Sequence, residues 1–277
     1  MQTIGLCRFS YLGEGGFQVK HETLAARQRY LFAPERLAER FATLETMTLP
    51  ALRAQTDGDF TLLIVVADAL PPEHRARLEA AVAGIPQAVI KAYPPGPHRK
   101  VMREAINSVR QPRDAPCLQF RMDDDDAVAV TFVARLKEAA QDLAALAKRH
   151  RHIAIDFNQG YIVRPSPQGL AAAPTQAPLS TAALALMFPP DVSLSVMNFG
   201  HRKLAQRMPV ISFTGEDMLI RGHNGHNDSR QKPGIAIPTF TPLDPAGKAH
   251  FKAAFNINAD EVAAAFSRLP VAAPDRR

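Results

Sequence analysis

The stretch Cys117-Leu118-Gln119-Phe120-Arg121-Met122 leads directly into four aspartates, Asp123-Asp124-Asp125-Asp126. The first six residues predict a strand, and the aspartates follow where that strand ends. Four adjacent carboxylates repel one another, and a divalent cation is one way to hold them together. Mg²⁺ and Mn²⁺ prefer hard oxygen ligands of this kind. Ligands of open α/β sheets bind beyond the carboxyl ends of strands, so the acidic run lies where such a site is expected.

Strand-like and helix-like segments alternate on both sides of this stretch. Strands are predicted at residues 3–9, 60–67, 88–93, 117–122 and 152–157, and helices at 33–54, 73–83, 97–109, 132–148 and 259–269. This alternation predicts an α/β fold with a mostly parallel, Rossmann-like sheet flanked by helices.

The pattern loosens in the second half of the chain. Residues 1–160 are predicted to form the nucleotide-binding core, and residues 161–270 a C-terminal part of the same domain that is more irregular. Residues 164–191 are rich in Pro, Ala and Ser and predict a loop, and residues 271–277 predict a disordered tail. The 277 residues fit one large domain or a domain with an elaborated C-terminal part.

The charge and composition restrict the class of partner. The formal net charge is +6, which suits an anionic partner such as a nucleotide diphosphate, an acidic glycan, an anionic lipid or a nucleic acid. Aromatic residues make up 7% and Trp is absent, which disfavours the stacking platforms of single-strand nucleic-acid binding, so no nucleic-acid partner is expected. Neither a signal-peptide pattern nor an apolar run of about 20 residues occurs, which predicts a cytoplasmic location that includes the inner membrane surface.

The acidic run has other interpretations. A solvated acidic turn is the simplest alternative. A calcium loop of the EF-hand type needs glycine at its sixth position, where this chain has Val128, and an aspartyl-phosphate hydrolase carries its Asp-x-Asp after the first strand. Val128 disfavours the calcium loop, and the position of the run, after three earlier predicted strands, disfavours the aspartyl-phosphate hydrolase.

Several segments resemble a known family in order and spacing. Residues 49–60, Leu-Pro-Ala-Leu-Arg-Ala-Gln-Thr-Asp-Gly-Asp-Phe, resemble the "QT-x-x-x-F" turn of GT-A glycosyltransferases, and residues 121–126 resemble their "R-hydrophobic-D-x-D-D" metal motif. Together with residues 8–11 and 15–18, they make the chain similar to a rhamnosyltransferase family of bacteria over roughly residues 3–240. The resemblance implies a GT-A-like fold.

The resemblance also implies roles for individual acidic residues. Asp123 and Asp125 match the two aspartates of the D-x-D motif, which bind the metal and the donor, and Asp124 between them is expected at the nucleotide sugar. Asp126 matches a further acidic position. Asp68 matches the residue that contacts the base or the ribose, although that strand end normally carries an acidic pair.

Basic residues near the same sheet edge are candidates for the phosphate groups. Arg8 leaves the first predicted strand toward this edge, where a guanidinium can bind phosphate in a bidentate manner, or it is a surface charge. Lys100 lies in the first turn of the helix that follows Pro97, where the helix N-terminus favours anions, and it is the candidate chosen from His98, Arg99 and Lys100; basic residues on an exposed first turn are the simpler interpretation.

A polar, glycine-containing segment at residues 221–230 contains His223 and His226, either of which is a candidate to complete the metal shell; a flexible polar loop is the alternative. Glu216 and Asp217 precede it and are candidates for the general base that deprotonates the acceptor hydroxyl. A surface acidic pair is the alternative interpretation of these two residues.

These observations predict a metal-dependent glycosyltransferase that uses Mn²⁺ or Mg²⁺. It would move rhamnose or another hexose from a nucleoside-diphosphate sugar to a glycan or lipid-linked acceptor. Two alternatives stay open. One is a non-catalytic nucleotide- or glycan-binding module on the same fold, and the other is a metal-dependent phosphohydrolase.

Overall fold

The computed structural model describes residues 1–15, 23–223 and 238–270 of the chain. The strands are β1 (Gln2–Phe9), β2 (Gly13–Glu14), β3 (Thr61–Ala67), β4 (Ala88–Tyr93), β5 (Gly96–Pro97), β6 (Cys117–Asp123), β7 (Ala127–Val128), β8 (Ile153–Phe157), β9 (Gln159–Ser166), β10 (Gly169–Gln176), β11 (Leu184–Phe188), β12 (Val210–Phe213), β13 (Leu219–Gly222) and β14 (Thr241–Pro242). The helices are α1 (Leu24–Leu31), α2 (Pro34–Thr43), η1 (Leu44–Thr48), α3 (Leu49–Arg53), α4 (Pro72–Val82), α5 (His98–Asn107), α6 (Phe132–Asp142), α7 (Ala144–Ala147), η2 (Val196–Asn198), η3 (His201–Gln206), α8 (Pro245–Phe255) and α9 (Ala259–Phe266).

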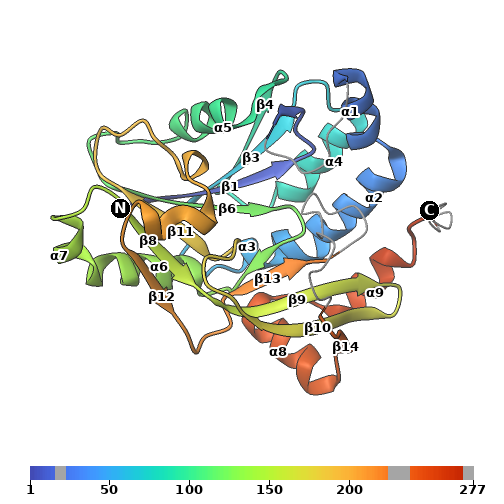
Figure 1. Ribbon diagram of the computed structural model, residues 1–277. Coiled ribbons are helices and arrows are strands. Elements are labelled where there is room, and N and C mark those ends of the chain that lie inside the picture. The colour runs from blue at the N-terminus through green and yellow to red at the C-terminus, as the bar shows by residue number, and fades with distance from the viewer. Residues whose placement is uncertain (16–22, 224–237, 271–277) are drawn as a thin grey trace.

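A seven-stranded sheet forms the centre of the molecule, in the order β12-β8-β11-β6-β1-β3-β4 (Figure 1). Every neighbouring pair is parallel except the two pairs that contain β11. The prediction of a mostly parallel, GT-A-like sheet flanked by helices is confirmed. Because β11 and β12 lie beyond residue 160, the sheet uses strands from both sides of the predicted division of the chain.

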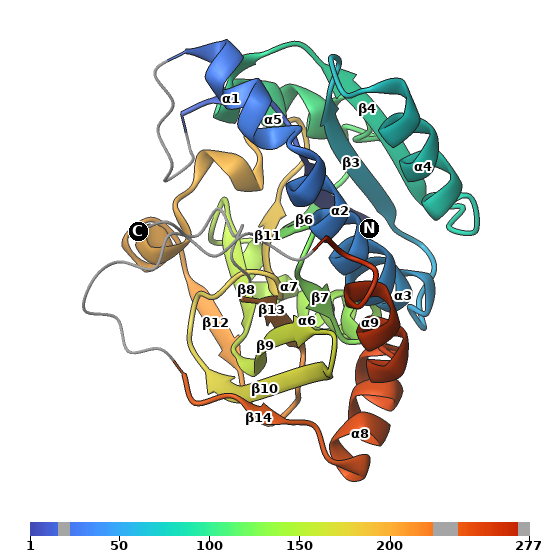
Figure 2. The ribbon, with the colours of Figure 1, turned by 90° about the vertical axis from the view of Figure 1, so that its right-hand side faces the viewer.

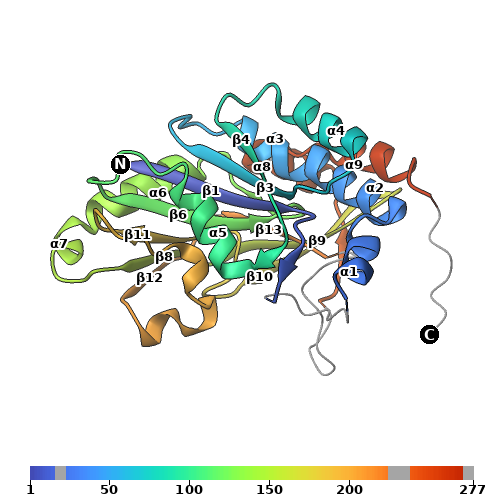
Figure 3. The ribbon, with the colours of Figure 1, turned by 90° about the horizontal axis from the view of Figure 1, so that it is seen from above.

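Helices cover both faces of this sheet (Figure 3). One face packs against α2, α3, α4 and α6 through one large cluster of buried apolar residues. The other face packs against α5, η2 and η3 through a second cluster. Strand β3 is buried from its second residue to its last, as expected for a strand that is covered on both faces.

A second sheet, in the order β14-β10-β9-β13-β7, lies below the first, and α8 and α9 pack at its side (Figure 2). The prediction of a loop over residues 164–191 is wrong, because this segment contains most of the β9–β10 hairpin and all of β11. Its small residues have weak strand propensity, and the ladder to β9 and β14 together with burial overrides that propensity. Helix α8 was also not predicted.

The predicted helix over residues 33–54 is observed as the continuous run α2–η1–α3. Its middle turn, Leu44–Thr48, is a π-helix that precedes Pro50. A proline lacks an N–H and crowds the carbonyl four residues earlier, and a wider turn relieves this conflict. Among the described residues, no helix has the length and apolar character that a membrane crossing requires.

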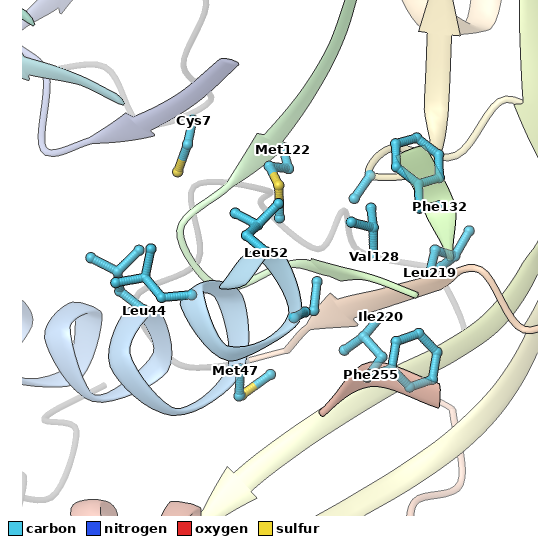
Figure 4. Close-up of a cluster of buried hydrophobic side chains, with 14 of the residues drawn as sticks. Cys7, Leu44, Met47, Leu52, Met122, Val128, Phe132, Leu219, Ile220 and Phe255 are labelled. Atoms are coloured by element: carbon cyan, nitrogen blue, oxygen red, sulfur yellow. The ribbon is translucent and has the colours of Figure 1, made fainter. Parts of the chain in front are cut away.

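The two sheets and this long helix share one apolar core (Figure 4). Leu44, Met47 and Leu52 of the helix pack with Met122 of β6 and with Val128 of β7. The core therefore fixes the position of the helix against the segment that contains the acidic run.

Replacing Phe132 with alanine is expected to lower the free energy of unfolding by about 3–5 kcal/mol, because it leaves a large cavity. The Phe132 ring is fully buried and lies 5.0 Å from the Phe120 ring and 5.9 Å from the Phe157 ring, centroid to centroid. Urea unfolding measures the change. The matched control is Leu24→Ala, because Leu24 is 47% exposed and its truncation should change stability by less than about 0.5 kcal/mol.

Candidate functional site

The acidic run connects the two sheets. Asp123 is the last residue of β6, and the chain enters β7 of the second sheet at Ala127. Asp124, Asp125 and Asp126 are buried, whereas the Asp123 side chain is 29% exposed. Three adjacent acids inside a protein need compensating charge or hydrogen bonds, because burial strongly disfavours an isolated carboxylate.

Arg8 compensates Asp123. The parallel register of β1 and β6 places these two residues side by side, and Arg8 Nη2 forms an ion pair with Asp123 Oδ1. Arg8 Nη1 also donates to Nε2 of His98, the first residue of α5, at 3.0 Å. Burial, followed by the charges of Arg8 and Arg121, lowers the pKa of His98 to about 3, so its ring is neutral and accepts this hydrogen bond.

Arg40 compensates the next two aspartates from the other face of the sheet. Its guanidinium forms an ion pair with Asp124 and lies 3.4 Å from a carboxylate oxygen of Asp125. Arg36 lies four residues earlier, on the same side of α2. Arg36 donates to the Ser10 hydroxyl and to the Leu31 carbonyl, both at 3.1 Å.

Two further contacts hold the backbone of the run. The Thr48 hydroxyl lies 3.0 Å from the carbonyl oxygen of Asp124 and 2.7 Å from that of Asp126. Gly222, at the end of β13, packs so closely that a Cβ there would lie 2.6 Å from the carbonyl oxygen of Asp125. The turn is therefore held by the π-helical segment on one side and by the second sheet on the other.

The environment separates the pKa values of chemically identical residues. Burial acts to raise the pKa of Asp123, but the charges of Arg8, Arg40 and Arg121 outweigh it and hold the pKa at about 2. Burial, followed by the charges of Asp125 and Asp123, raises the pKa of Asp126 well above its ordinary value. Asp126 Oδ2 also accepts a hydrogen bond from the backbone N–H of Asp123 at 3.0 Å.

A second basic group lies beside Arg8 on the α5 face of the sheet. Arg121 Nη2 donates to His201 Nδ1 at 3.1 Å. Burial, followed by the charge of Arg121, lowers the pKa of His201 to about 4, so His201 stays neutral beside the guanidinium. Burial and the nearby Arg8 lower the pKa of Arg121 to about 10, which still leaves it charged at neutral pH.

A small pocket opens where these groups meet, at the carboxyl ends of β1 and β6. Its lining residues are Arg8, Ser10, Tyr11, Leu31, Arg36, Arg40, Asp123 and Asp124. Ser10 turns the chain out of β1 with φ 51°, a left-handed conformation that is uncommon for a residue with a side chain. Three guanidinium groups and two carboxylates thus surround one polar opening.

Two other predicted residues lie at the same edge. Asp68 directly follows β3 and is exposed. Burial, followed by the charges of Glu14 and Asp68, raises the pKa of Tyr11 to about 12, so the Asp68 carboxylate lies near this residue of the pocket. Lys100 is exposed in the first turn of α5. It is His98, two residues earlier, that contacts Arg8.

The structure does not bring Glu216 and Asp217 to the acidic run. Both precede β13, whereas Gly222, at the far end of β13, packs against Asp125. At about 3.3 Å per residue, about 16 Å of extended backbone separates Asp217 from Gly222. Glu216 pairs with Arg135 at 2.7 Å on the surface. This placement gives no support to the expectation that either residue is the general base at the donor.

Asp217 belongs instead to a polar cluster at the second sheet. It accepts hydrogen bonds from Gln159 Nε2 and the Tyr161 hydroxyl, and it pairs with His250 of α8, each at 2.9 Å. These contacts join α8 to β9 and to the start of β13.

The described residues do not form a complete ligand set for Mn²⁺ or Mg²⁺. Within residues 1–15, 23–223 and 238–270, no three His, Cys, Asp or Glu side chains gather as a metal site requires. Asp123 and Asp125 have suitable oxygen atoms, but each faces a guanidinium. His223 follows Gly222 and so lies near Asp125, and His226 lies outside the described residues. Metal binding therefore stays a prediction.

Sequence reasoning missed several residues of this site, namely Arg36, Arg40, Thr48 and His201. Arg36 and Arg40 did give a signal. They recur four residues apart beside the apolar residues Leu37 and Phe41, on the face of the helix that the periodicity assigns to the core. An arginine on such a face needs an acidic partner.

Comparison with known proteins assigns the chain to a family. A family model described as "Putative rhamnosyl transferase" matches residues 2–236. None of the curated proteins matches the chain.

Solved structures that are similar to the chain share little sequence with it. S. aureus TarS 1–349 in complex with UDP-GlcNAc is 10% identical, with a TM-score of 0.44 over 84% of this chain and 62% of that chain. A UDP-glucose pyrophosphorylase complexed with UDP-glucose is 10% identical, with a TM-score of 0.34 over 78% of this chain and 91% of that chain. The chain thus spans about 60% of the length of the TarS 1–349 chains that it matches.

Replacing Gly222 with alanine is expected to destabilise the protein by about 1–3 kcal/mol, because the new Cβ would overlap Asp125 and push the acidic turn. The control is Gly200→Ala, where a Cβ meets nothing within 4 Å and the backbone φ is −75°. Urea unfolding of both variants tests the contact. Equal midpoints for the two variants would contradict it.

Proposed function

We propose that this chain, which belongs to the putative rhamnosyl transferase family, is a glycosyltransferase that takes its sugar from a nucleoside-diphosphate sugar. Family membership supports glycosyl transfer. The donor sugar that we propose is rhamnose or another hexose, and the acceptor is a hydroxyl group of a glycan or a lipid-linked saccharide.

The observation that carries this proposal is the guanidinium-lined pocket at the carboxyl ends of β1 and β6. A nucleoside diphosphate carries its negative charge on the two phosphates, and guanidinium groups bind phosphate oxygens through paired, charge-assisted hydrogen bonds. Charge develops on the diphosphate as the glycosidic bond breaks, so fixed positive groups at this position lower the barrier.

Arg8 is the group that we place at the diphosphate. Its side chain is 19% exposed, whereas Arg36 and Arg40 are nearly fully buried. Asp123 and His98 hold the guanidinium from two sides, so its orientation is fixed before a ligand binds. Because His98 is neutral, it holds Arg8 without adding a competing positive charge.

The nucleoside is proposed to lie over the ends of β1 and β3, near Tyr11 and Asp68. Both residues follow strands that are neighbours in the sheet, and the crevice beyond such strand ends is where open α/β sheets bind nucleotides. Mn²⁺ or Mg²⁺ stays a predicted cofactor, so we design the assay to measure its effect separately.

Arg8→Met is expected to lower kcat/KM for donor turnover by about 10- to 100-fold, because a charge-assisted contact to the departing diphosphate is lost. The assay measures release of nucleoside diphosphate from a panel of nucleotide sugars, with and without acceptor, in Mn²⁺, in Mg²⁺ and with a chelator. The control is Arg75→Met, which removes an exposed guanidinium that pairs with Glu79 on α4 and should leave kcat/KM unchanged.

Other outcomes would select the alternative functions. A donor that raises the melting temperature but is never turned over would indicate a binding module. Release of inorganic phosphate from simple phosphate esters would indicate a phosphohydrolase. Full donor turnover by Arg8→Met would contradict the placement of the diphosphate at Arg8.

A further inference from the structure

The long helix α2–η1–α3 makes two separate attachments to the acidic run. Arg40, in α2, binds the side chains of Asp124 and Asp125. Thr48, at the end of η1, binds the backbone carbonyls of Asp124 and Asp126. Because both residues belong to one continuous helix, the side chains and the backbone of the turn are fixed relative to the same rigid element.

The burial of these groups makes Arg40 indispensable to the turn. Asp124 and Asp125 are each 1% exposed and Arg40 is 3% exposed, so little water reaches any of the three charges. Removing one partner from a buried ion pair leaves an uncompensated charge inside the protein, which is strongly unfavourable. The planar guanidinium fork suits two neighbouring carboxylates, whereas a lysine ammonium is a single point charge.

The aspartates of the run contact different arginines on the two faces of the sheet. Asp124 and Asp125 point toward α2 and bind Arg40. Asp123 points to the opposite face, toward Arg8 and α5, and is the most exposed of the first three. Asp123, Asp124 and Asp125 are adjacent in one short turn, and Gly222 packs against Asp125. Holding Asp124 and Asp125 in place therefore also fixes the direction of Asp123.

We propose that Arg40 is a positioning residue, which holds the acidic turn through Asp124 and Asp125 and thereby presents Asp123 and Arg8 to the donor. This inference rests on the proposed function for its kinetic consequence, but the ion pair itself has a test that is independent of any substrate. On this view the four aspartates do not act as equivalents: two hold the turn from inside, and Asp123 faces the ligand.

A double-mutant cycle tests the ion pair. We expect Arg40→Met to lower the urea midpoint strongly, and Asp124→Asn in the Arg40→Met background to raise it again, because the second change removes a charge that the first left unpaired. If the two changes simply add, Arg40 does not hold Asp124. This cycle needs no substrate, so it decides the structural part even if no donor is turned over.

The kinetic part is tested with Arg40→Lys, which keeps a buried positive charge and is expected to fold. Because a lysine ammonium is a point charge and lacks the planar fork of a guanidinium, it is not expected to hold the two carboxylates in the same geometry, and kcat at saturating donor is expected to fall by about tenfold or more. Asp124→Asn in the Arg40→Lys background is not expected to restore kcat, since it does not restore the geometry in which Arg40 held Asp124 and Asp125.

The matched control is Arg53→Lys on the same helix, where an exposed arginine donates to the Ala81 carbonyl at 3.0 Å. Neither its urea midpoint nor its kcat should differ from those of the unmodified chain. An Arg40→Lys variant that is folded and has unchanged kcat would overturn the positioning role. An unmodified chain that releases no nucleoside diphosphate from any donor would refute the proposed function instead, and the cycle above would still report on Arg40.

Discussion

The structure depends on compensation of the acidic run by two arginines that approach from opposite faces of the central sheet. Arg8 binds Asp123 on the α5 face, and Arg40 binds Asp124 and Asp125 on the α2 face. Without these guanidinium groups, adjacent carboxylates at the end of a buried strand would repel one another in a region of low dielectric constant.

The order of the strands and the helical connection after β1 bring Arg8 and Arg40 to the acidic run. Because β1 lies beside β6 in parallel register, the arginine near the end of one strand meets the aspartate at the end of the other. The helix after β1 then crosses one face of the sheet and brings Arg40 to the turn. Gln55, just beyond α3, donates to the Ala129 carbonyl at 2.8 Å and accepts from the Val133 N–H at 3.0 Å, so the same connection also fixes the chain after the run.

Periodicity predicted the parallel half of the fold well, because buried strands such as residues 60–67 and amphipathic helices such as 132–148 have strong local patterns. It failed for residues 164–191, where small residues form strands only because neighbouring strands pair with them. In the site, Arg8 and Asp123 could be placed from strand ends alone. Arg40 could not be placed, because the periodicity of a helix shows which face is buried but not which distant turn that face contacts. Glu216 and Asp217 could not be placed relative to the run for a related reason, since their distance from it depends on the direction of β13.

The four aspartates also show why a motif defines a location better than it defines roles. Asp123 has a pKa of about 2 beside Arg8, whereas burial and its acidic neighbours raise the pKa of Asp126 well above the ordinary value. Arg40 already supplies to Asp124 and Asp125 the positive charge that a bound cation would bring, so any ligand that needs those two carboxylates must compete with a buried guanidinium. Asp123 is paired instead with Arg8, which is more exposed than Arg40 and lines the pocket at the carboxyl ends of β1 and β6.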